Sequence, residues 1–170
     1  MNLPNNYCCI YTIYINIMII TLVQALIFVA YVTFLMVKFK GPLPSISQSW
    51  YRLKYPVRIL FNVFCLSLGL LMTFHEQSVL FFLSGVGLSA VGIASWSMSK
   101  EKLTVWIHFA GAIIGMLLAL LGIGFGLGNW VPLSIWALGS IFMLLFKIKD
   151  NYWWIEILAF VTIIIGLLNL

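Results

Sequence analysis

Charged residues are scarce in this chain. They make up 8% of its 170 residues, whereas a soluble domain carries roughly 25%. Apolar residues make up 64% of the sequence, and a fold in water cannot bury that much apolar surface. This balance excludes an ordinary water-soluble domain. The sequence predicts an integral membrane protein in which residues 1–170 form one transmembrane domain.

Acidic residues are scarcer still. The chain has four of them against nine lysines and arginines, which gives a net charge of +5. A basic protein can bind nucleic acid, but these cations fall in short segments between apolar runs, where membrane topology already accounts for them. We therefore expect no nucleic-acid partner.

Residues with the chemistry of metal sites and of catalysis are also few. The three cysteines are Cys8, Cys9 and Cys65, and their spacing does not suit zinc. Two histidines cannot build a three-histidine site, and the chain has neither an H-E-x-x-H nor a G-x-S-x-G motif. We expect no metal and no cofactor, assign no catalytic residue, and favour a protein that is not an enzyme.

Apolar runs dominate what is present. Six of them come close to the roughly 20 residues that a helix needs to cross a bilayer, and short polar segments separate them. The sequence predicts an all-α fold, a polytopic bundle of six transmembrane helices. The predicted spans cover about residues 10–37, 57–74, 78–98, 103–127, 130–146 and 153–170.

The longest polar segment, the basic loop at residues 38–56 with Arg58 just beyond it, predicts the topology. Five of the nine basic residues lie here, with no acid among them, and cytoplasmic loops are the ones enriched in Lys and Arg. Alternating spans then bring all nine cations to the cytoplasmic side and both termini to the other side. We expect a multi-pass protein of a cell membrane, most simply the bacterial cytoplasmic membrane. The residues predicted to bind lipid headgroups are Lys38, Lys40, Arg52, Lys54 and Arg58.

The basic loop also contains a helix signal. Pro44 followed by serines is typical of a helix start, and alternating aromatic and basic residues come next. We expect a short interfacial helix over about residues 47–55. In this interpretation Trp50, Tyr51 and Leu53 dip into the headgroup layer while the basic side chains face the phosphates.

Small residues recur at steps of three and four in several spans, which is typical of helix faces that meet other helices in a membrane. The clearest face consists of Gly111, Gly115 and Ala119, and its first two members form a G-x-x-x-G pattern. Packing inside the bundle is one interpretation of this face. The same pattern permits a homo-oligomer.

Only two ionisable residues fall inside the predicted spans, His108 and Glu156, and a charge in hydrocarbon is a functional-site hypothesis by default. Both lie near the cytoplasmic end. Glu156 is alternatively explained by snorkelling to the headgroups, and His108 by a hydrogen bond to a neighbouring helix. The residues predicted to line a cytoplasm-facing ligand pocket are Asn62, His108, Glu156, Ser45, Ser47 and Tyr51.

Three short motifs between about residues 40 and 125 carry a family resemblance. They are the P-S-I-S-Q-S-W-Y stretch at residues 44–51, the glycine-rich run from Gly85 to Gly92, and W-I-H-F-A-G-A at residues 106–112. Together they resemble uncharacterised small six-helix membrane proteins of bacteria and phages, which are similar to the damage-regulated-autophagy-modulator type. The resemblance implies a six-helix bundle with the P-S-I-S loop close to His108, and it implies no established reaction.

Three functions stay open on the sequence alone. The favoured one is a non-enzymatic membrane protein whose polar pocket and basic loop bind anionic lipid headgroups or a small ligand. The second is a small transporter or channel subunit that uses His108 and Glu156. The third is a membrane-embedded lipid enzyme that uses His108.

Overall fold

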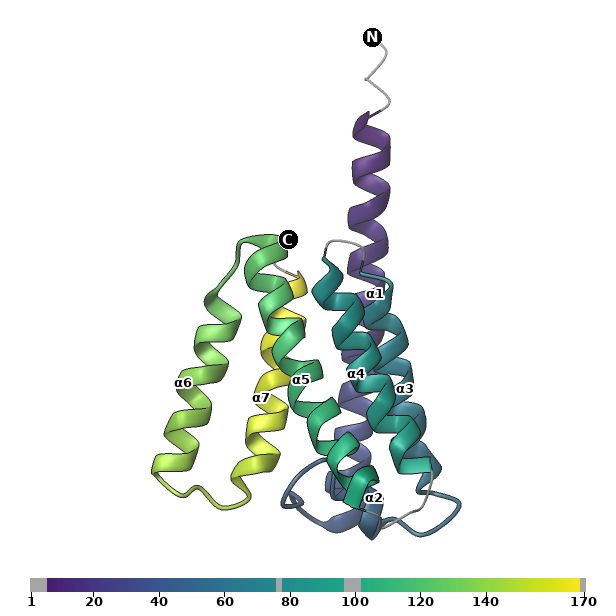
Figure 1. Ribbon diagram of the computed structural model, residues 1–170, viewed down its shortest axis with the longest axis vertical. Coiled ribbons are helices and arrows are strands. Elements are labelled where there is room, and N and C mark those ends of the chain that lie inside the picture. Colours follow the sequence, from purple (N-terminus) through teal and green to yellow (C-terminus); the bar gives the residue numbers. More distant parts are fainter. Residues whose placement is uncertain (1–5, 76–77, 97–101, 169–170) are drawn as a thin grey trace.

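The computed structural model describes residues 6–75, 78–96 and 102–168, and every regular element in these residues is a helix. The prediction of an all-α fold is confirmed. The helices are α1 (Asn6–Phe39), α2 (Ser49–Arg52), α3 (Ile59–Thr73), α4 (Val79–Trp96), α5 (Lys102–Leu127), α6 (Val131–Leu145) and α7 (Asn151–Leu168). All except the short α2 lie side by side and alternate in direction, and α1 projects beyond the others (Figure 1).

The long helices divide into two length classes. The stretches Ile15–Phe39, Trp106–Leu127 and Asn151–Leu168 are long and apolar enough to cross a membrane, whereas Ile59–Thr73, Val79–Ala94 and Val131–Leu145 are apolar but shorter. A helix of 15 residues is about 22 Å long at 1.5 Å per residue, below the roughly 30 Å of a hydrocarbon core. Each of the six predicted spans overlaps one of these stretches.

Helix α1 packs along a single seam. Its buried positions recur at alternating steps of four and three, the spacing of a heptad repeat, so one face stays on the bundle for about five turns. Two of the buried side chains are polar, although the helix as a whole is strongly apolar. The buried residues of the seam are Ile17, Thr21, Gln24, Phe28, Tyr31 and Leu35.

Helices α3, α4 and α5 meet almost backbone to backbone. A Cβ atom added at Gly69 of α3 would lie 2.7 Å from the carbonyl oxygen of Gly85 in α4, and one added at Gly111 of α5 would lie 2.8 Å from that of Gly87. Gly115 faces Leu88 of α4 in the same way. Small residues allow this close approach.

This packing uses the glycine face of α5 that we considered for a second copy of the chain. Gly111 and Gly115 contact α4, and Ala119 is fully buried. The face therefore packs inside the bundle, as the first interpretation has it. A homo-oligomer through glycine-rich helix faces stays a prediction.

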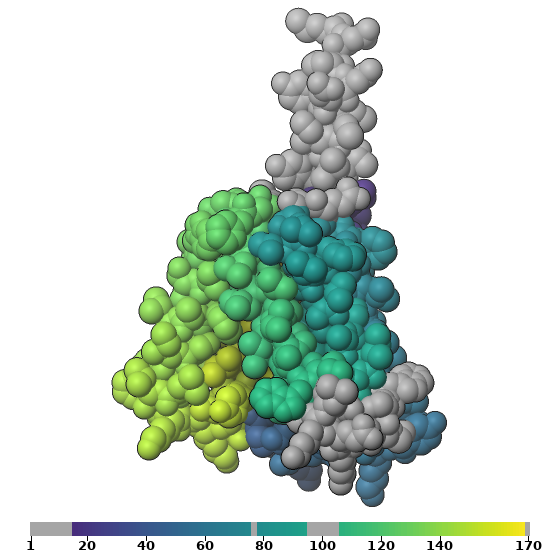
Figure 2. Space-filling model, in the orientation of Figure 1, coloured from purple at the N-terminus to yellow at the C-terminus, as the bar shows by residue number. Residues whose placement is uncertain are grey.

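Helix α6 forms the outer edge of the bundle. Its only glycine, Gly139, faces the flexible end of Leu158 in α7, and most of its apolar side chains are exposed. In the space-filling view α4, α5 and α6 form one surface, with a strip of α7 visible between α5 and α6 (Figure 2). Exposed apolar residues on α6 include Ile135, Leu138, Ile141, Phe142 and Leu145.

The segment between α1 and α3 differs from the interfacial helix that we expected. Only α2 is helical, and the chain is already extended at Leu53. Trp50 and Leu53 do not point outward as expected, because they are buried in a cluster with Phe61 of α3 and Trp153 of α7. The loop folds under the end of the bundle because its own apolar side chains complete that core.

Candidate functional site

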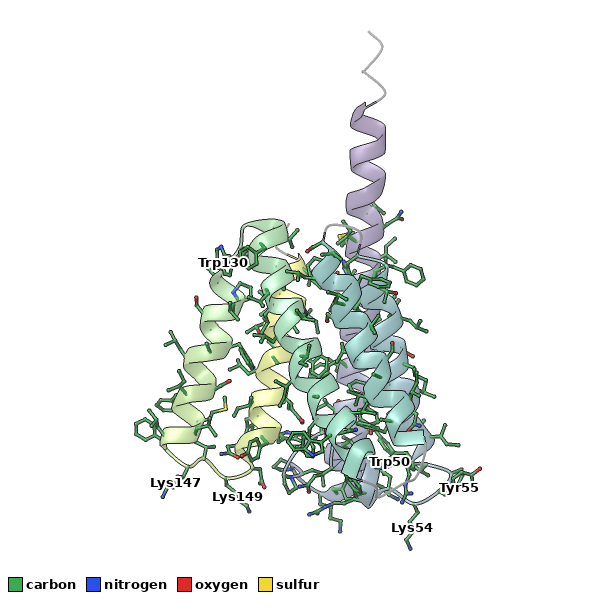
Figure 3. All side chains as sticks on the ribbon, in the orientation of Figure 1. Trp50, Lys54, Tyr55, Trp130, Lys147 and Lys149 are labelled. Carbon is green, nitrogen blue, oxygen red and sulfur yellow. The ribbon has the colours of Figure 1, made fainter. Side chains whose placement is uncertain are left out.

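The predicted site lies at one end of the bundle, which we call the basic end. Trp50, Lys54, Tyr55, Lys147 and Lys149 all lie there, whereas Trp130 lies at the opposite end, to which we give the name outer end (Figure 3). The basic end is formed by α2 with its flanking loops and by the turn between α6 and α7.

Glu156 of α7 fastens the loop to the bundle. Its carboxylate accepts hydrogen bonds from the backbone N–H of Ile46 and from the hydroxyl of Ser47, at 3.2 Å; the backbone N–H of Ser47 donates to it as well. One turn earlier in α7, the backbone N–H of Trp153 donates to the carbonyl oxygen of Pro44 at 3.1 Å. We call this set of contacts the loop latch. It explains Glu156 without snorkelling, so that alternative is wrong.

Tyr31 connects the loop to α1. Its hydroxyl lies 2.7 Å from the hydroxyl of Ser49, and its ring stacks on Phe64 of α3 at 4.3 Å between centroids. Ser49 is fully buried, and a buried hydroxyl needs such a partner. Tyr31 was not predicted as a site residue, because α1 is apolar on every side and its sequence does not mark the face that is buried.

His108 of α5 is packed between helices. It is 4% exposed, its ring stacks on Phe61 at 5.7 Å between centroids, and it is hydrogen-bonded to the backbone of Val91 in α4. Phe61 in turn contacts Trp50 at 6.4 Å between centroids. His108 and the P-S-I-S loop thus share one end of the bundle with Phe61 between them, and the alternative of a hydrogen bond to a neighbouring helix describes His108 well.

The remaining predicted pocket residues divide into buried and outward-facing ones. Asn62 is 1% exposed and cannot line an open pocket. The Ser45 hydroxyl accepts the Gln48 N–H at 3.1 Å within a local turn. Tyr51 is 52% exposed, because the short α2 turns Trp50 inward and the next residue outward; its assignment to the pocket is corrected. The structure brings Ser47 and Glu156 together, buries Asn62 and His108, and leaves Ser45 and Tyr51 at the surface.

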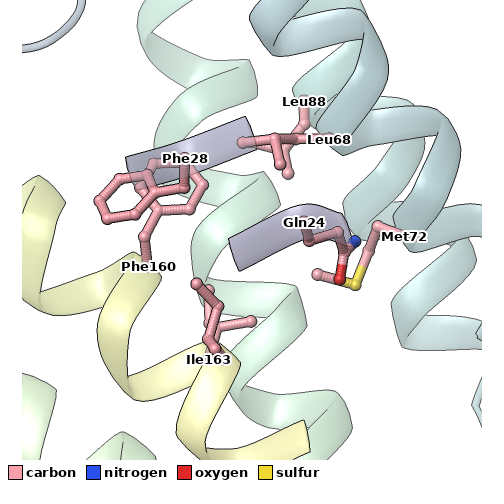
Figure 4. A pocket seen from close by; sticks show the side chains of 8 residues that line it. Gln24, Phe28, Leu68, Met72, Leu88, Phe160 and Ile163 are labelled. Atoms are coloured by element: carbon pink, nitrogen blue, oxygen red, sulfur yellow. The ribbon is translucent and has the colours of Figure 1, made fainter. Parts of the chain in front are cut away.

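A small cavity lies elsewhere, among α1, α3, α4 and α7 (Figure 4). Its volume is about 20 Å³, enough for roughly one water molecule. Gln24 is its polar residue, and Phe28 and Phe160, 4.8 Å apart between ring centroids, close one side. This cavity was not predicted, because it forms only where side chains of four helices pack together.

Gln24 also has a polar partner near the outer end. Its side-chain oxygen lies 3.4 Å from His75 Nε2, and His75 follows α3 in the turn that leads to α4. His75 is 1% exposed, and burial lowers its pKa to about 4 because a charged imidazole loses its hydration there. His75 is thus held inside the bundle although it lies in a turn between two helices.

The predicted headgroup-binding cations differ in their surroundings. Lys38, Lys40, Arg52 and Lys54 are exposed. Arg58 is half-buried, with its guanidinium 4.8 Å from the centre of the Trp50 ring and its Nε–H donating to the Leu53 carbonyl at 3.2 Å. Arg58 therefore stabilises the fold of the loop, since a cation over a tryptophan face is attracted to it.

Within the described ranges, no group of three or more His, Cys, Asp or Glu side chains could hold a metal ion. No family model, no curated protein and no solved structure matches the chain. The resemblance to small six-helix membrane proteins stays a prediction.

Proposed function

We propose that this chain is a six-span membrane protein whose cytoplasmic, basic end binds the headgroups of anionic lipids. Both termini then lie on the other side of the membrane, and the bacterial cytoplasmic membrane is the simplest location. The proposal makes the chain a non-enzymatic, lipid-binding bundle.

The six-span part of the proposal is supported by the arrangement of the helices. The three shorter ones lie beside the longer ones and alternate with them in direction (Figure 1), and exposed apolar side chains occur on both classes. In hydrocarbon every backbone polar group must be satisfied internally, which these helices do. The shorter helices do not have to cross the whole membrane by themselves, because the turn residues at each end reach into the headgroup layers.

The single observation that carries the lipid-binding part is the position of the cations. Lys40 follows α1, Arg52 and Lys54 flank the end of α2, and Lys147 and Lys149 follow α6. All of these are exposed, and they belong to elements that meet at the basic end (Figure 3). A cytoplasmic leaflet rich in anionic lipid attracts such residues by roughly 1 kcal/mol each.

Native mass spectrometry of the detergent-solubilised protein tests this proposal. We expect tighter association with phosphatidylglycerol, which is anionic, than with phosphatidylcholine. The triple variant Lys40→Gln, Arg52→Gln, Lys54→Gln should lower the affinity for phosphatidylglycerol about 100-fold. The control variant Gln48→Asn, Tyr51→Phe, Tyr55→Phe changes exposed loop residues without changing charge and should bind as the wild type does. Equal affinity of the wild type for both lipids would overturn the proposal.

Topology is tested separately. Reporters inserted at residues 50 and 101 should report the same, cytoplasmic face. Reporters on opposite faces would refute the six-span threading.

The two other functions predicted from the sequence have less support. A transporter or a lipid enzyme that uses His108 needs this side chain to reach an aqueous path or a substrate, whereas it is packed against Phe61 and buried. Flux across liposomes that is lost in His108→Ala would support the transporter. Lipid turnover that is lost in the same variant would support the enzyme.

A further inference from the structure

Two of the helices that run to the basic end are followed by a lysine with a positive φ angle. Lys40 follows α1 with φ 55°, and Lys147 follows within two residues of α6 with φ 49°. Residues with a side chain rarely adopt this left-handed conformation, because the Cβ atom then crowds the backbone.

Both ends have the long hydrogen bond of a Schellman motif, and the end of α6 also has the shorter one, because the Lys147 N–H donates to the Leu144 carbonyl at 3.3 Å. Beyond α1 the N–H of Gly41 donates to the carbonyl of Met36 at 3.1 Å, and beyond α6 the N–H of Ile148 donates to that of Met143, also at 3.1 Å. In each motif the lysine occupies the position that glycine normally holds.

At the outer end of the bundle, glycine occupies the left-handed position after a helix. Helix α5 is followed by Gly128 with φ 70°, and a Cβ added there would meet nothing within 4 Å. The only other described residue with a side chain and positive φ is Asp150, and aspartate tolerates this conformation comparatively well. Lysine has no such tolerance, so both positions lower the stability of the fold.

Attraction between a cation and the carbonyl end of a helix does not by itself explain these positions. A cation anywhere in the last turn supplies that attraction. Helix α1 already has such a cation, Lys38, in its last turn and in ordinary helical conformation. A lysine immediately beyond the last turn holds its ammonium group past the helix end, where a lipid phosphate lies if the basic end faces the headgroups.

We propose that Lys40 and Lys147 each bind the headgroup phosphate of an anionic phospholipid, so that the lipid-binding surface extends from the basic loop to the turn between α6 and α7. This inference rests on the proposed function. It goes further than the proposed function by assigning a phosphate contact to these two lysines in particular, and it explains why both glycine-like positions carry a cation.

The variant Lys147→Gly tests the inference with two readouts of opposite sign. Affinity for phosphatidylglycerol in native mass spectrometry should fall about fivefold. The thermal midpoint in lipid-free detergent should rise by roughly 2 °C, because glycine relieves the strained conformation. Lys147→Asn, a neutral residue that also tolerates this conformation, should lose the same affinity. Lys40→Gly should behave as Lys147→Gly does.

Two controls separate charge from conformation. Lys149→Gln removes a cation from the same turn at a position without positive φ and should not raise the thermal midpoint. Gly128→Lys places a lysine in the left-handed position at the outer end, and should lower the midpoint without tightening phosphatidylglycerol binding.

Wild-type affinity in Lys147→Gly, or a lowered midpoint, would overturn the inference. If the wild type still prefers phosphatidylglycerol and the triple loop variant loses that preference, the proposed function survives such a result. Displacement of bound phosphatidylglycerol by inorganic phosphate would also overturn it, because the site would then belong to a soluble anion.

Discussion

Helices α3, α4 and α5 meet through backbone atoms, whereas α1 and α6 meet their neighbours through large side chains. In the first region a Cβ at Gly69 or Gly111 would lie under 3 Å from a carbonyl oxygen of the next helix. In the second, Phe28 and Tyr31 of α1 and Leu158 opposite α6 make the contacts. Backbones cannot move aside as side-chain ends can, so the first region should tolerate substitution poorly and the second should tolerate it well.

The loop and α1 also depend on a few polar contacts. The loop latch at Glu156 and the pair of Gln24 with His75 are such contacts. Substitutions at these places should lower stability by removing hydrogen bonds or altering charge. Substitutions of the glycines should lower it by adding volume where the helices touch.

The largest expected effect is that of Gly69→Ala. Its Cβ would lie 2.7 Å from both the carbonyl oxygen of Gly85 and the backbone nitrogen of Ser89, so α3 and α4 must separate. We expect a loss of at least about 3 kcal/mol in the free energy of unfolding, measured by SDS titration in mild detergent. Gly139→Ala is the control: its Cβ meets the movable end of Leu158 and should cost under about 1 kcal/mol. Equal losses would remove the contrast between the two regions.

Glu156→Ala should have the next largest effect. It deprives the N–H groups of Ile46 and Ser47 and the Ser47 hydroxyl of their acceptor, for a loss of about 2–3 kcal/mol. Hydrogen exchange at these two amides and tryptic cleavage at Arg52 and Lys54 should both accelerate. Ser45→Ala, which removes only a local turn contact, should leave the loop protected. Unchanged exchange in Glu156→Ala would show that apolar packing alone holds the loop.

His75 should make stability depend on pH. Its pKa is about 4 in the folded chain and about 6.5 when unfolded, so the unfolded chain binds the proton more readily. Its contribution is fully present above pH 6.5 and is lost as the pH falls toward 4, by about 2 kcal/mol between pH 7 and pH 5. His75→Gln should flatten this part of the SDS-unfolding profile. A variant profile as steep as that of the wild type would assign the dependence to another group.

Ser84→Ala should have the smallest effect. The Ser84 hydroxyl donates to the Gly115 carbonyl at 2.7 Å across the α4–α5 contact, and removing one such bond costs roughly 1 kcal/mol. The alanine still fits because it is smaller than serine. A loss near that of Gly69→Ala would mean that hydrogen bonding, more than close packing, holds the glycine region together.

The helices and their approximate bounds could be predicted because hydrophobic length is a local property. The residues that belong to the site were only partly predictable. Glu156 and Ser47 were identified, but their direct contact spans 109 residues, and no pattern in the sequence specifies which loop donors reach which carboxylate. Gln24, Tyr31 and His75 were missed, since their importance comes from burial between helices.

By itself the sequence determined that the chain is helical and apolar enough for a membrane, and that its cations are concentrated in a few short segments. These properties follow from composition and spacing, which each segment carries alone. The tertiary structure decided which helices approach through glycine, that the basic loop folds inward onto Glu156, and that Lys40 and Lys147 end their helices in a strained conformation. Those outcomes depend on how separate segments fill the space between them, which no single segment encodes.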